Sequence, residues 1–161
     1  MSILNVENKT LAKLSRFDLL IDGEENVDDA GVLQMEFSDG TVLELELKPD
    51  GESVSYNWKD LEKTEEEDKT TGWFKIDLSN RNPYNNLIRK KIKFSDDLLF
   101  GAKEESEDKL VIAGFGFQFE DNQTLIYYNA GDFAKIYVNE MPTKFEDTFK
   151  LVWRNKFSLL I

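Results

Sequence analysis

Two stretches of this chain, 82 positions apart, follow the same pattern of residues. The first reads FSDGTVLELEL (37–47) and the second reads FEDNQTLIYYN (119–129). In each stretch apolar residues alternate with others, which is the period-two signal of a half-buried β-strand. An Asp-Gly pair in the first copy and an Asp-Asn pair in the second interrupt the alternation with residues that tolerate positive φ. Each copy is therefore predicted to be a β-hairpin.

The same offset extends on both sides of the two hairpins. It places Leu33 on Phe115, Leu45 on Tyr127 and Val54 on Ile136. A third strand is predicted in each copy, within ESVSYNW (52–58) and FAKIYVN (133–139), after turns at PDGE and NAGD. Upstream, FDLLIDG (17–23) resembles DDLLFG (96–101), although this match needs a gap.

These patterns predict a mainly β or α+β fold, with an antiparallel sheet built from two pseudo-repeats at about 30–58 and 112–140. The length favours a single domain over residues 1–161. Within it we expect pseudo-repeat 1 at about 11–60, a connector at 61–86, pseudo-repeat 2 at about 87–142 and a C-terminal segment at 143–161.

Two segments can be read as either helix or strand. NKTLAKLSRF (8–17) places Leu11, Leu14 and Phe17 on one face of a helix, but it also suits a strand. Near the C-terminus, Thr143-x-x-Glu146 is a capping box that favours a possible C-terminal helix. KLVWRNKFSLLI (150–161) is equally compatible with a hairpin.

The chain contains no His and no Cys. Their absence removes imidazole acid–base catalysis, thiolate nucleophiles and Cys/His zinc sites, so we predict a protein that is not an enzyme and has no cofactor or metal. GFGFQF (114–119) alternates as a strand, and its glycines indicate a bulge or a close approach rather than a phosphate loop. DGEENVDDAG (22–31) has carboxylates but lacks the glycine at position six that a calcium loop needs.

The net charge is −12, and all of the excess lies in residues 1–80, which hold 20 acidic and 8 basic residues. Such a field repels nucleic acid and anionic membranes and favours cationic partners, although solubility alone also explains it. The basic stretch IRKKIK (88–93) is interpreted as an edge strand guarded by lysines. The first residues do not form a signal peptide and no apolar stretch is long enough to span a membrane, so a cytoplasmic location is expected.

The two copies are predicted to differ on their outer faces. If Leu43 and Leu45 point into the core, the alternation turns acidic side chains outward in the first copy: Glu36, Glu44 and Glu46. Their equivalents in the second copy are Gln118, Ile126 and Tyr128. This secondary, apolar face is either covered by another part of the chain, with the C-terminal segment as the main candidate, or is a contact surface that would make a homodimer.

An acidic loop and two tryptophans complete the candidate binding residues. EEEDK (65–69) lies between Trp58 and Trp73 in sequence. Aromatic anchors beside carboxylates are typical of tight interfaces with basic proteins, while solvated loops and core tryptophans are the alternative. The predicted partner-binding set is Glu36, Glu44, Glu46, Trp58, Glu65, Glu66, Glu67, Asp68 and Trp73.

The phrasing GVLQMEFSDGTVLEL (31–45), repeated less closely as GFGFQFEDNQTLIYY (114–128), resembles the bacterial immunity proteins of polymorphic toxin systems. The resemblance covers about half of the chain, and it implies a non-enzymatic, cytoplasmic protein that binds and inhibits a cognate toxin domain with a basic surface. The alternative is a β-rich domain that binds a small ligand or assembles with itself.

Overall fold

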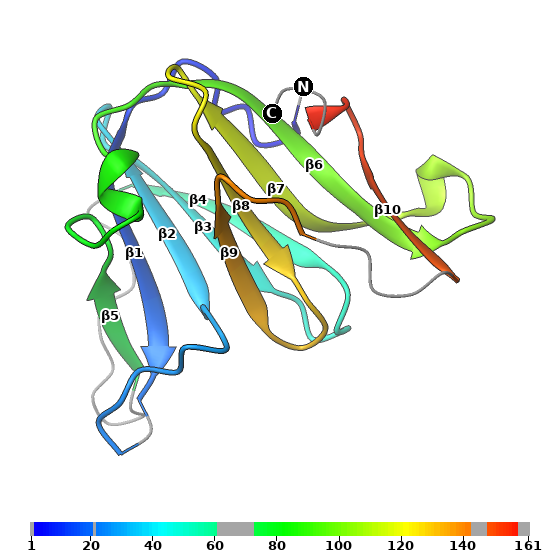
Figure 1. The fold of residues 1–161 in the computed structure, drawn as a ribbon, viewed down its shortest axis with the longest axis horizontal. Helices are drawn as coiled ribbons and strands as arrows, with labels where there is room; N and C mark the ends of the chain where they lie inside the picture. The colour runs from blue at the N-terminus through cyan, green and yellow to red at the C-terminus, as the bar shows by residue number, and fades with distance from the viewer. Residues whose placement is uncertain (1, 21, 61–72, 143–147, 158–161) are drawn as a thin grey trace.

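A computed structural model describes residues 2–20, 22–60, 73–142 and 148–157. It contains two five-stranded antiparallel sheets, with strand orders β4-β3-β2-β1-β5 and β10-β6-β7-β8-β9 (Figure 1). The strands of sheet 1 are β1 (Leu11–Leu19), β2 (Val32–Phe37), β3 (Thr41–Leu47), β4 (Val54–Asp60) and β5 (Trp73–Asp77). Those of sheet 2 are β6 (Ile92–Ala102), β7 (Val111–Phe119), β8 (Thr124–Asn129), β9 (Ala134–Val138) and β10 (Phe149–Trp153). Two 3₁₀ turns, η2 (Tyr84–Asn86) and η3 (Glu107–Lys109), lie in connections. The prediction of an antiparallel β fold is confirmed.

The two sheets repeat one topology. In each, four strands follow one another as a meander, and a fifth strand returns to pair with the free side of the first. We call the part of the chain that contains β1–β5 unit 1 and the part that contains β6–β10 unit 2. The two units meet at an antiparallel bridge between Thr10 and Lys91, just before β1 and β6. Lys9 and Lys90, which precede the bridge residues, each form an ion pair with the hairpin turn of their own unit, at Asp39 and Asp121.

The hairpin turns have the backbone that the sequence predicts. Gly40 and Asn122 both have positive φ, at 85° and 71°. Leu45 opposes Leu33 in sheet 1, and Tyr127 opposes Phe115 in sheet 2, so the offset of 82 holds through these strands.

The offset fails at the next strand. Val54 pairs with Leu47 in sheet 1, whereas Ala134 pairs with Asn129 in sheet 2. The residue equivalent to Val54 is therefore Ala134 and not Ile136, because the turn before β9 is two residues shorter than the turn before β4.

The helical interpretation of the N-terminal segment is wrong, since Leu11–Leu19 forms β1. A register shift between Leu11 and Lys13 places Leu11 opposite Phe37 and Leu14 opposite Met35. This bulge puts two leucines three positions apart on the same core-facing side, which imitates helical spacing.

The C-terminal segment also forms a strand where it is described. Phe149–Trp153 is β10, which pairs with β6, so the predicted helix is absent from residues 148–157. The proposed capping box at 143 and 146 lies outside the described residues. The prediction of a lysine-guarded edge strand at 88–93 is also wrong, because residues 88–91 precede β6 and the backbone of Lys90 and Ile92 is bonded to the N-terminal segment at residues 8–11.

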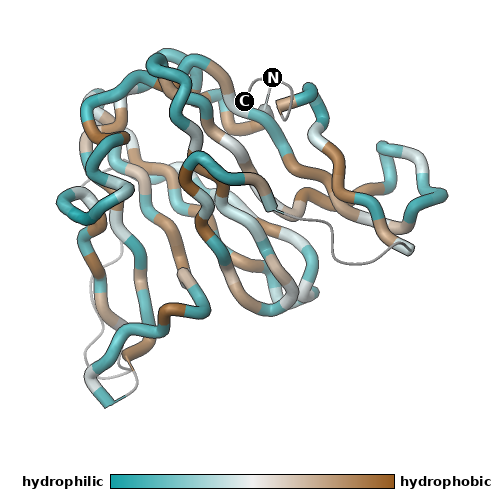
Figure 2. The backbone as a smooth tube through the Cα atoms, in the orientation of Figure 1, coloured by the Kyte–Doolittle hydropathy of each residue, from teal (hydrophilic) through white to brown (hydrophobic). Residues whose placement is uncertain are grey.

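The inner faces of the two sheets share one hydrophobic core. Leu14, Leu33 and Leu43 from sheet 1 are in the same buried cluster as Phe115 and Phe117 from sheet 2. Figure 2 shows hydrophobic residues recurring along the strands of both sheets, with hydrophilic residues concentrated in the connections. The N-terminal segment contributes as well, because Leu4 and Val6 are in this cluster.

A second cluster covers the outer face of sheet 2. Phe157 is fully buried and Trp153 packs against it, with ring centroids 4.5 Å apart. A Cβ on Gly116 would lie 2.8 Å from the ring of Trp153, so this glycine allows the ring to approach the strand. This close approach agrees with the interpretation of GFGFQF as a strand whose glycines make room for a neighbour.

Two adjacent tyrosines of β8 are expected to respond oppositely to loss of the hydroxyl group. Tyr127 donates a 2.6 Å hydrogen bond to the carbonyl of Gly31, whereas the buried Tyr128 hydroxyl has no partner within the described residues. Burial also raises the pKa of Tyr128 to about 12. Tyr127→Phe should lower the free energy of unfolding by about 1 kcal/mol. Tyr128→Phe should leave it unchanged or raise it, because the penalty for burying an unpaired hydroxyl is removed.

Urea denaturation of the two variants, each compared with the wild type, measures this difference. Equal destabilisation by both substitutions would contradict the assigned environments of the two hydroxyl groups.

Candidate binding loop and groove

The connection between β1 and β2 forms an acidic loop, residues 22–31, which we call the Val27 loop. In Figure 1 it projects beyond the ends of the strands at the lower left. Arg16 on β1 anchors its base, because the guanidinium is almost fully buried and donates to the carbonyls of Asp29 and Ala30 at 3.3 and 3.4 Å. Arg16 also forms ion pairs with Asp18 at 3.1 Å and with Glu25 at 3.2 Å.

Further hydrogen bonds fix the backbone of the Val27 loop. Asp18 is buried and accepts a 2.7 Å bond from the amide of Asn26. Arg81, from the connection after β5, binds both carboxylate oxygens of Glu25, at 2.8 and 3.1 Å. The hydrogen bond from Arg81, together with the charges of Arg81 and Arg16, holds the pKa of Glu25 below its usual value. The backbone of the loop is therefore held in place by contacts with β1 and with the connection after β5.

The tip of the loop combines an exposed apolar side chain with carboxylates. Val27 is 90% exposed, and Asp22, Glu24 and Asp28 are exposed around it. No hydrogen bond or ion pair engages these three carboxylates within the described part of the chain. An apolar tip ringed by unpaired negative charge is suited to contact with a basic surface that has an apolar hollow.

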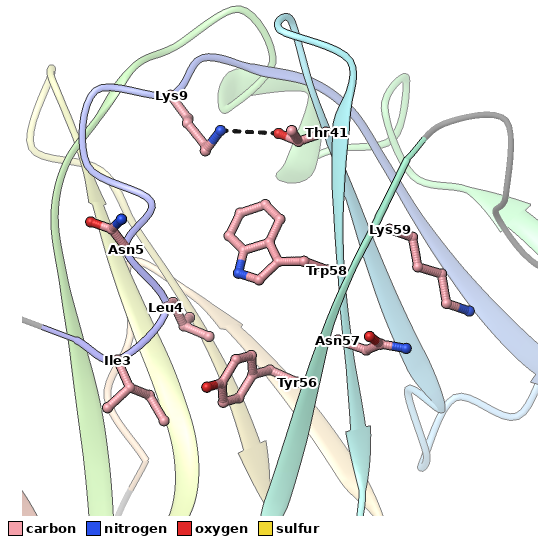
Figure 3. Close-up of a pocket in the computed structure, with 9 residues that line it drawn as sticks. All are labelled: Ile3, Leu4, Asn5, Lys9, Thr41, Tyr56, Asn57, Trp58 and Lys59. Atoms are coloured by element: carbon pink, nitrogen blue, oxygen red, sulfur yellow. Dashed lines mark hydrogen bonds between the residues drawn. The ribbon is translucent and has the colours of Figure 1, made fainter.

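A second candidate site is a groove along the free edge of β4, opposite the N-terminal segment (Figure 3). Its volume is about 720 Å³. Tyr56 and Trp58 point into it from β4, and Ile3 faces Tyr56 from the other wall. Ile3 and Tyr56 are 46% and 41% exposed, so the groove presents apolar surface to solvent.

The predicted acidic outer face of sheet 1 is only partly present. Glu46 is exposed as expected and Glu36 is half-buried, but Glu44 is buried. Glu44 accepts a 2.9 Å hydrogen bond from Gln34 and forms a 2.7 Å ion pair with Lys59. Cross-strand partners thus neutralise the central carboxylate, and the prediction that it points into solvent is wrong.

The remaining predicted residues are distributed as follows. Trp58 is half-buried, packs against Phe37 with ring centroids 5.8 Å apart, and lines the β4 groove. Trp73 is the first residue of β5, where it pairs with Leu19. Glu65, Glu66, Glu67 and Asp68 lie outside the described residues.

The secondary face predicted in the second copy is covered by the chain itself. Gln118, Ile126 and Tyr128 are at most 2% exposed. Phe157 and Trp153 pack over this face, so the C-terminal segment occupies it, as the covering alternative expects.

The sequence shows residues 22–31 as carboxylates that do not fit a calcium loop, and it does not predict the exposed apolar tip at Val27. A signal was available, since a single valine stands between two acidic pairs in EENVDD (24–29). An apolar residue inside an acidic connection has no core to enter unless the loop folds back. What the sequence does not reveal is the anchor, because Arg16 reads as one of the exposed charges of a strand.

Comparison with models of known protein families, with curated proteins and with solved structures finds no match for this chain. Among the described residues, no group of three or more acidic side chains is gathered so as to hold a metal ion. No helix in that part of the chain is long and apolar enough to cross a membrane.

Proposed function

We propose that this is a non-enzymatic, immunity-type protein that binds and inhibits a cognate bacterial toxin domain with a basic surface. The observation that carries the proposal is the Val27 loop, in which an almost fully exposed valine lies among three carboxylates that have no partner in the described part of the chain, on an anchored backbone. A loop that is already ordered loses little conformational entropy when it binds, so more of its contact energy appears as affinity.

The distribution of charge supports a cationic partner. The whole excess of negative charge lies in residues 1–80, the half of the chain that contains the Val27 loop. A concentrated negative field accelerates encounter with a positive partner and orients it toward the loop. Inhibition then follows from steric blocking of a basic cleft, with the loop carboxylates occupying sites that otherwise bind phosphate groups.

The proposed contact surface, the Val27 loop, differs from the partner-binding residues that the sequence predicts. Glu44 is neutralised by Lys59 and contributes no free charge. Glu46 remains exposed on the outer face of sheet 1 and is retained as a rim contact. Trp58 belongs to the β4 groove and is assigned to a separate surface below.

The second candidate function is a β-rich domain that binds a small ligand, and the β4 groove is the observation that favours it. Its walls combine the apolar and aromatic side chains of Ile3, Leu4, Tyr56 and Trp58 with polar ones, as small-molecule sites usually do. The groove is open along its length, however, which suits an extended chain better than an enclosed ligand. Self-assembly through Tyr128 would first require release of the segment containing Phe157.

Affinity capture from the native host tests the proposed function. The tagged protein is incubated with lysate at about 50 mM and then about 500 mM salt, and bound proteins are identified by mass spectrometry. We expect one stoichiometric basic partner whose binding weakens at the higher salt, since screening shortens the range of charge attraction to a few ångströms. No partner at either salt, or a complex insensitive to salt, would count against a charge-driven inhibitor.

A further inference from the structure

Within the described residues, the edge of β4 that faces away from β3 presents unpaired backbone groups on the core-facing residues. The amide of Lys48 donates to the carbonyl of Ser53 at 2.9 Å, which makes these two residues a hydrogen-bonded pair. Because such pairs alternate along an antiparallel ladder, the N–H and C=O groups of Val54, Tyr56 and Trp58 point away from β3, toward the groove.

The equivalent edge of sheet 2 is occupied by the chain itself. The bond from the amide of Ala130 to the carbonyl of Phe133, at 2.9 Å, shows that β9 has the same alternation as β4. At the first outward position of β9, the carbonyl of Ala134 accepts a 2.8 Å bond from the amide of Ala30. The amide of Ala134 donates to the side chain of Asp29 at 2.9 Å. Asp29 and Ala30, at the base of the Val27 loop, therefore cap this edge at Ala134.

No such cap is present at β4 within the described residues. The residues of unit 2 that correspond to Asp29 and Ala30 are Val111 and Ile112, which instead pair with β6 as part of β7. They line one wall of a second groove of about 440 Å³ that begins at Val54. Ile3 and Tyr56 line both grooves, so together they form one channel along the edge of β4.

We propose that this channel binds an extended, acidic segment of another protein chain, which adds to β4 as a further strand. The mode of binding extends the one that Asp29 and Ala30 display at β9, where one backbone amide donates to the edge and a carboxylate accepts from the edge amide beside it. Tyr56 and Trp58 supply apolar contacts for alternate side chains of the added strand.

The charges of the channel favour an acidic occupant. Lys9 and Lys48 line it, together with Lys59 and Asp50. Lys59 points away from the channel and is paired with Glu44. Asp50 accepts bonds from the amides of Glu52 and Ser53 at 2.9 and 2.8 Å, so its own turn satisfies it. Lys9 is itself paired with Asp39 and donates to Thr41, so Lys48 is the charge that remains to meet the occupant.

The shape of the channel favours a single strand over the edge of a second folded copy. Its far wall is formed by the N-terminal segment at Ile3 and Leu4 and by the start of β7. An isolated extended segment can enter between two walls, whereas the edge of a five-stranded sheet carries neighbours that would collide with them. This surface is independent of the Val27 loop, and its test does not depend on the proposed function.

The test uses a peptide with the sequence of residues 26–32, NVDDAGV, which contains the chain's own cap for β9. Backbone amide resonances of the isotopically labelled protein are followed while this capped peptide is added. A control peptide, NVKKAGV, reverses the charge. We expect saturable shifts centred on Val54, Tyr56 and Trp58 with the acidic peptide, and binding weaker by about tenfold or more with the basic one.

Two substitutions at one position separate backbone pairing from side-chain contact. Tyr56→Pro removes the N–H that points into the channel, and an edge strand tolerates proline when that N–H faces outward. Tyr56→Ala removes the ring but keeps the N–H. Circular dichroism checks that both variants retain the β fold. We expect Tyr56→Ala to weaken peptide binding and Tyr56→Pro to abolish it.

Three results would overturn the proposal. The first is no shift at β4 with either peptide, and the second is binding that Tyr56→Pro leaves equal to Tyr56→Ala. The third is concentration-dependent dimerisation, measured by analytical ultracentrifugation, that Tyr56→Pro abolishes, since the occupant would then be a second copy of this chain.

Discussion

Replacing Arg16 by methionine is expected to lower the free energy of unfolding by about 3–5 kcal/mol, the usual cost of removing one partner of a buried ion pair. Methionine keeps much of the volume of the side chain but donates no hydrogen bond. The buried carboxylate of Asp18 loses its counter-charge, and the carbonyls of Asp29 and Ala30 lose their donor. Urea denaturation measures the change.

The same substitution should loosen the Val27 loop. Amide hydrogen exchange at Asn26 and Asp28 is expected to accelerate more than exchange in the strands, because the bonds at these amides depend on the base of the loop. Arg81→Ala is the matched control, since Arg81 binds the same Glu25 but its side chain is 50% exposed. It should cost less than about 1 kcal/mol. Equal effects of the two substitutions would contradict the role of Arg16 as the anchor.

Replacing Asp96 by alanine is expected to release the C-terminal segment from sheet 2 and to cost about 3 kcal/mol or more, since hydrogen bonds to a charged group contribute about 1.5–3 kcal/mol. Asp96 is completely buried. It accepts bonds from the amide of Asn155 at 2.8 Å, from the side-chain amide of Asn155 at 3.0 Å and from the amide of Phe157 at 3.1 Å. Without them, the turn that holds Phe157 over β7 keeps, within the described part of the chain, only the bonds from Arg154 to Asp97.

Two measurements check this prediction. Urea denaturation gives the loss in stability, and binding of a hydrophobic dye reports exposure of the face around Ile126 and Tyr128. Asp108→Ala is the control, because Asp108 is an exposed aspartate on the η3 turn that bonds only to Ser106 among the described residues. It should change stability by no more than about 0.5 kcal/mol. A stable Asp96→Ala protein with no added dye binding would show that packing of Phe157 alone retains the segment.

Much of the fold is predictable from the sequence because strand alternation and turn residues are local signals. The two hairpins follow from period-two patterns around residues with positive φ at 40 and 122. The burial of the outer face of sheet 2 could also be predicted, since Ile126 and Tyr128 replace glutamates of the first copy and require a cover.

The features that escaped prediction depend on contacts distant in the sequence. The bulge after Leu11 places two leucines on one side of a strand at a spacing that resembles a helix. The shorter turn before β9 shifts the equivalence of the last meander strand. Whether the Glu44 carboxylate is exposed to solvent or paired depends on the register of β4, because the register sets the position of Lys59. No local pattern carries this information.

Part of the candidate site could also be predicted from the sequence. The sequence indicated an acidic first half and aromatic residues near the third strand, and Trp58 does line the β4 groove. The order of the Val27 loop comes from Arg16, Asp18 and Arg81, which converge only after β1 and β5 pair. A loop of five acidic residues is otherwise expected to be mobile and solvated.

The most direct measurement of the central claim is the affinity of the captured basic partner for two charge-reversal variants, determined by isothermal titration calorimetry. Asp28→Lys changes the tip of the Val27 loop, and Glu104→Lys makes the same change at an exposed position in the corresponding connection of unit 2. We predict that Asp28→Lys weakens binding by about 100-fold, or ~2.7 kcal/mol, while Glu104→Lys changes it by less than about threefold. Equal losses in the two variants would show that the partner responds to overall charge, and the Val27 loop would not be its binding site.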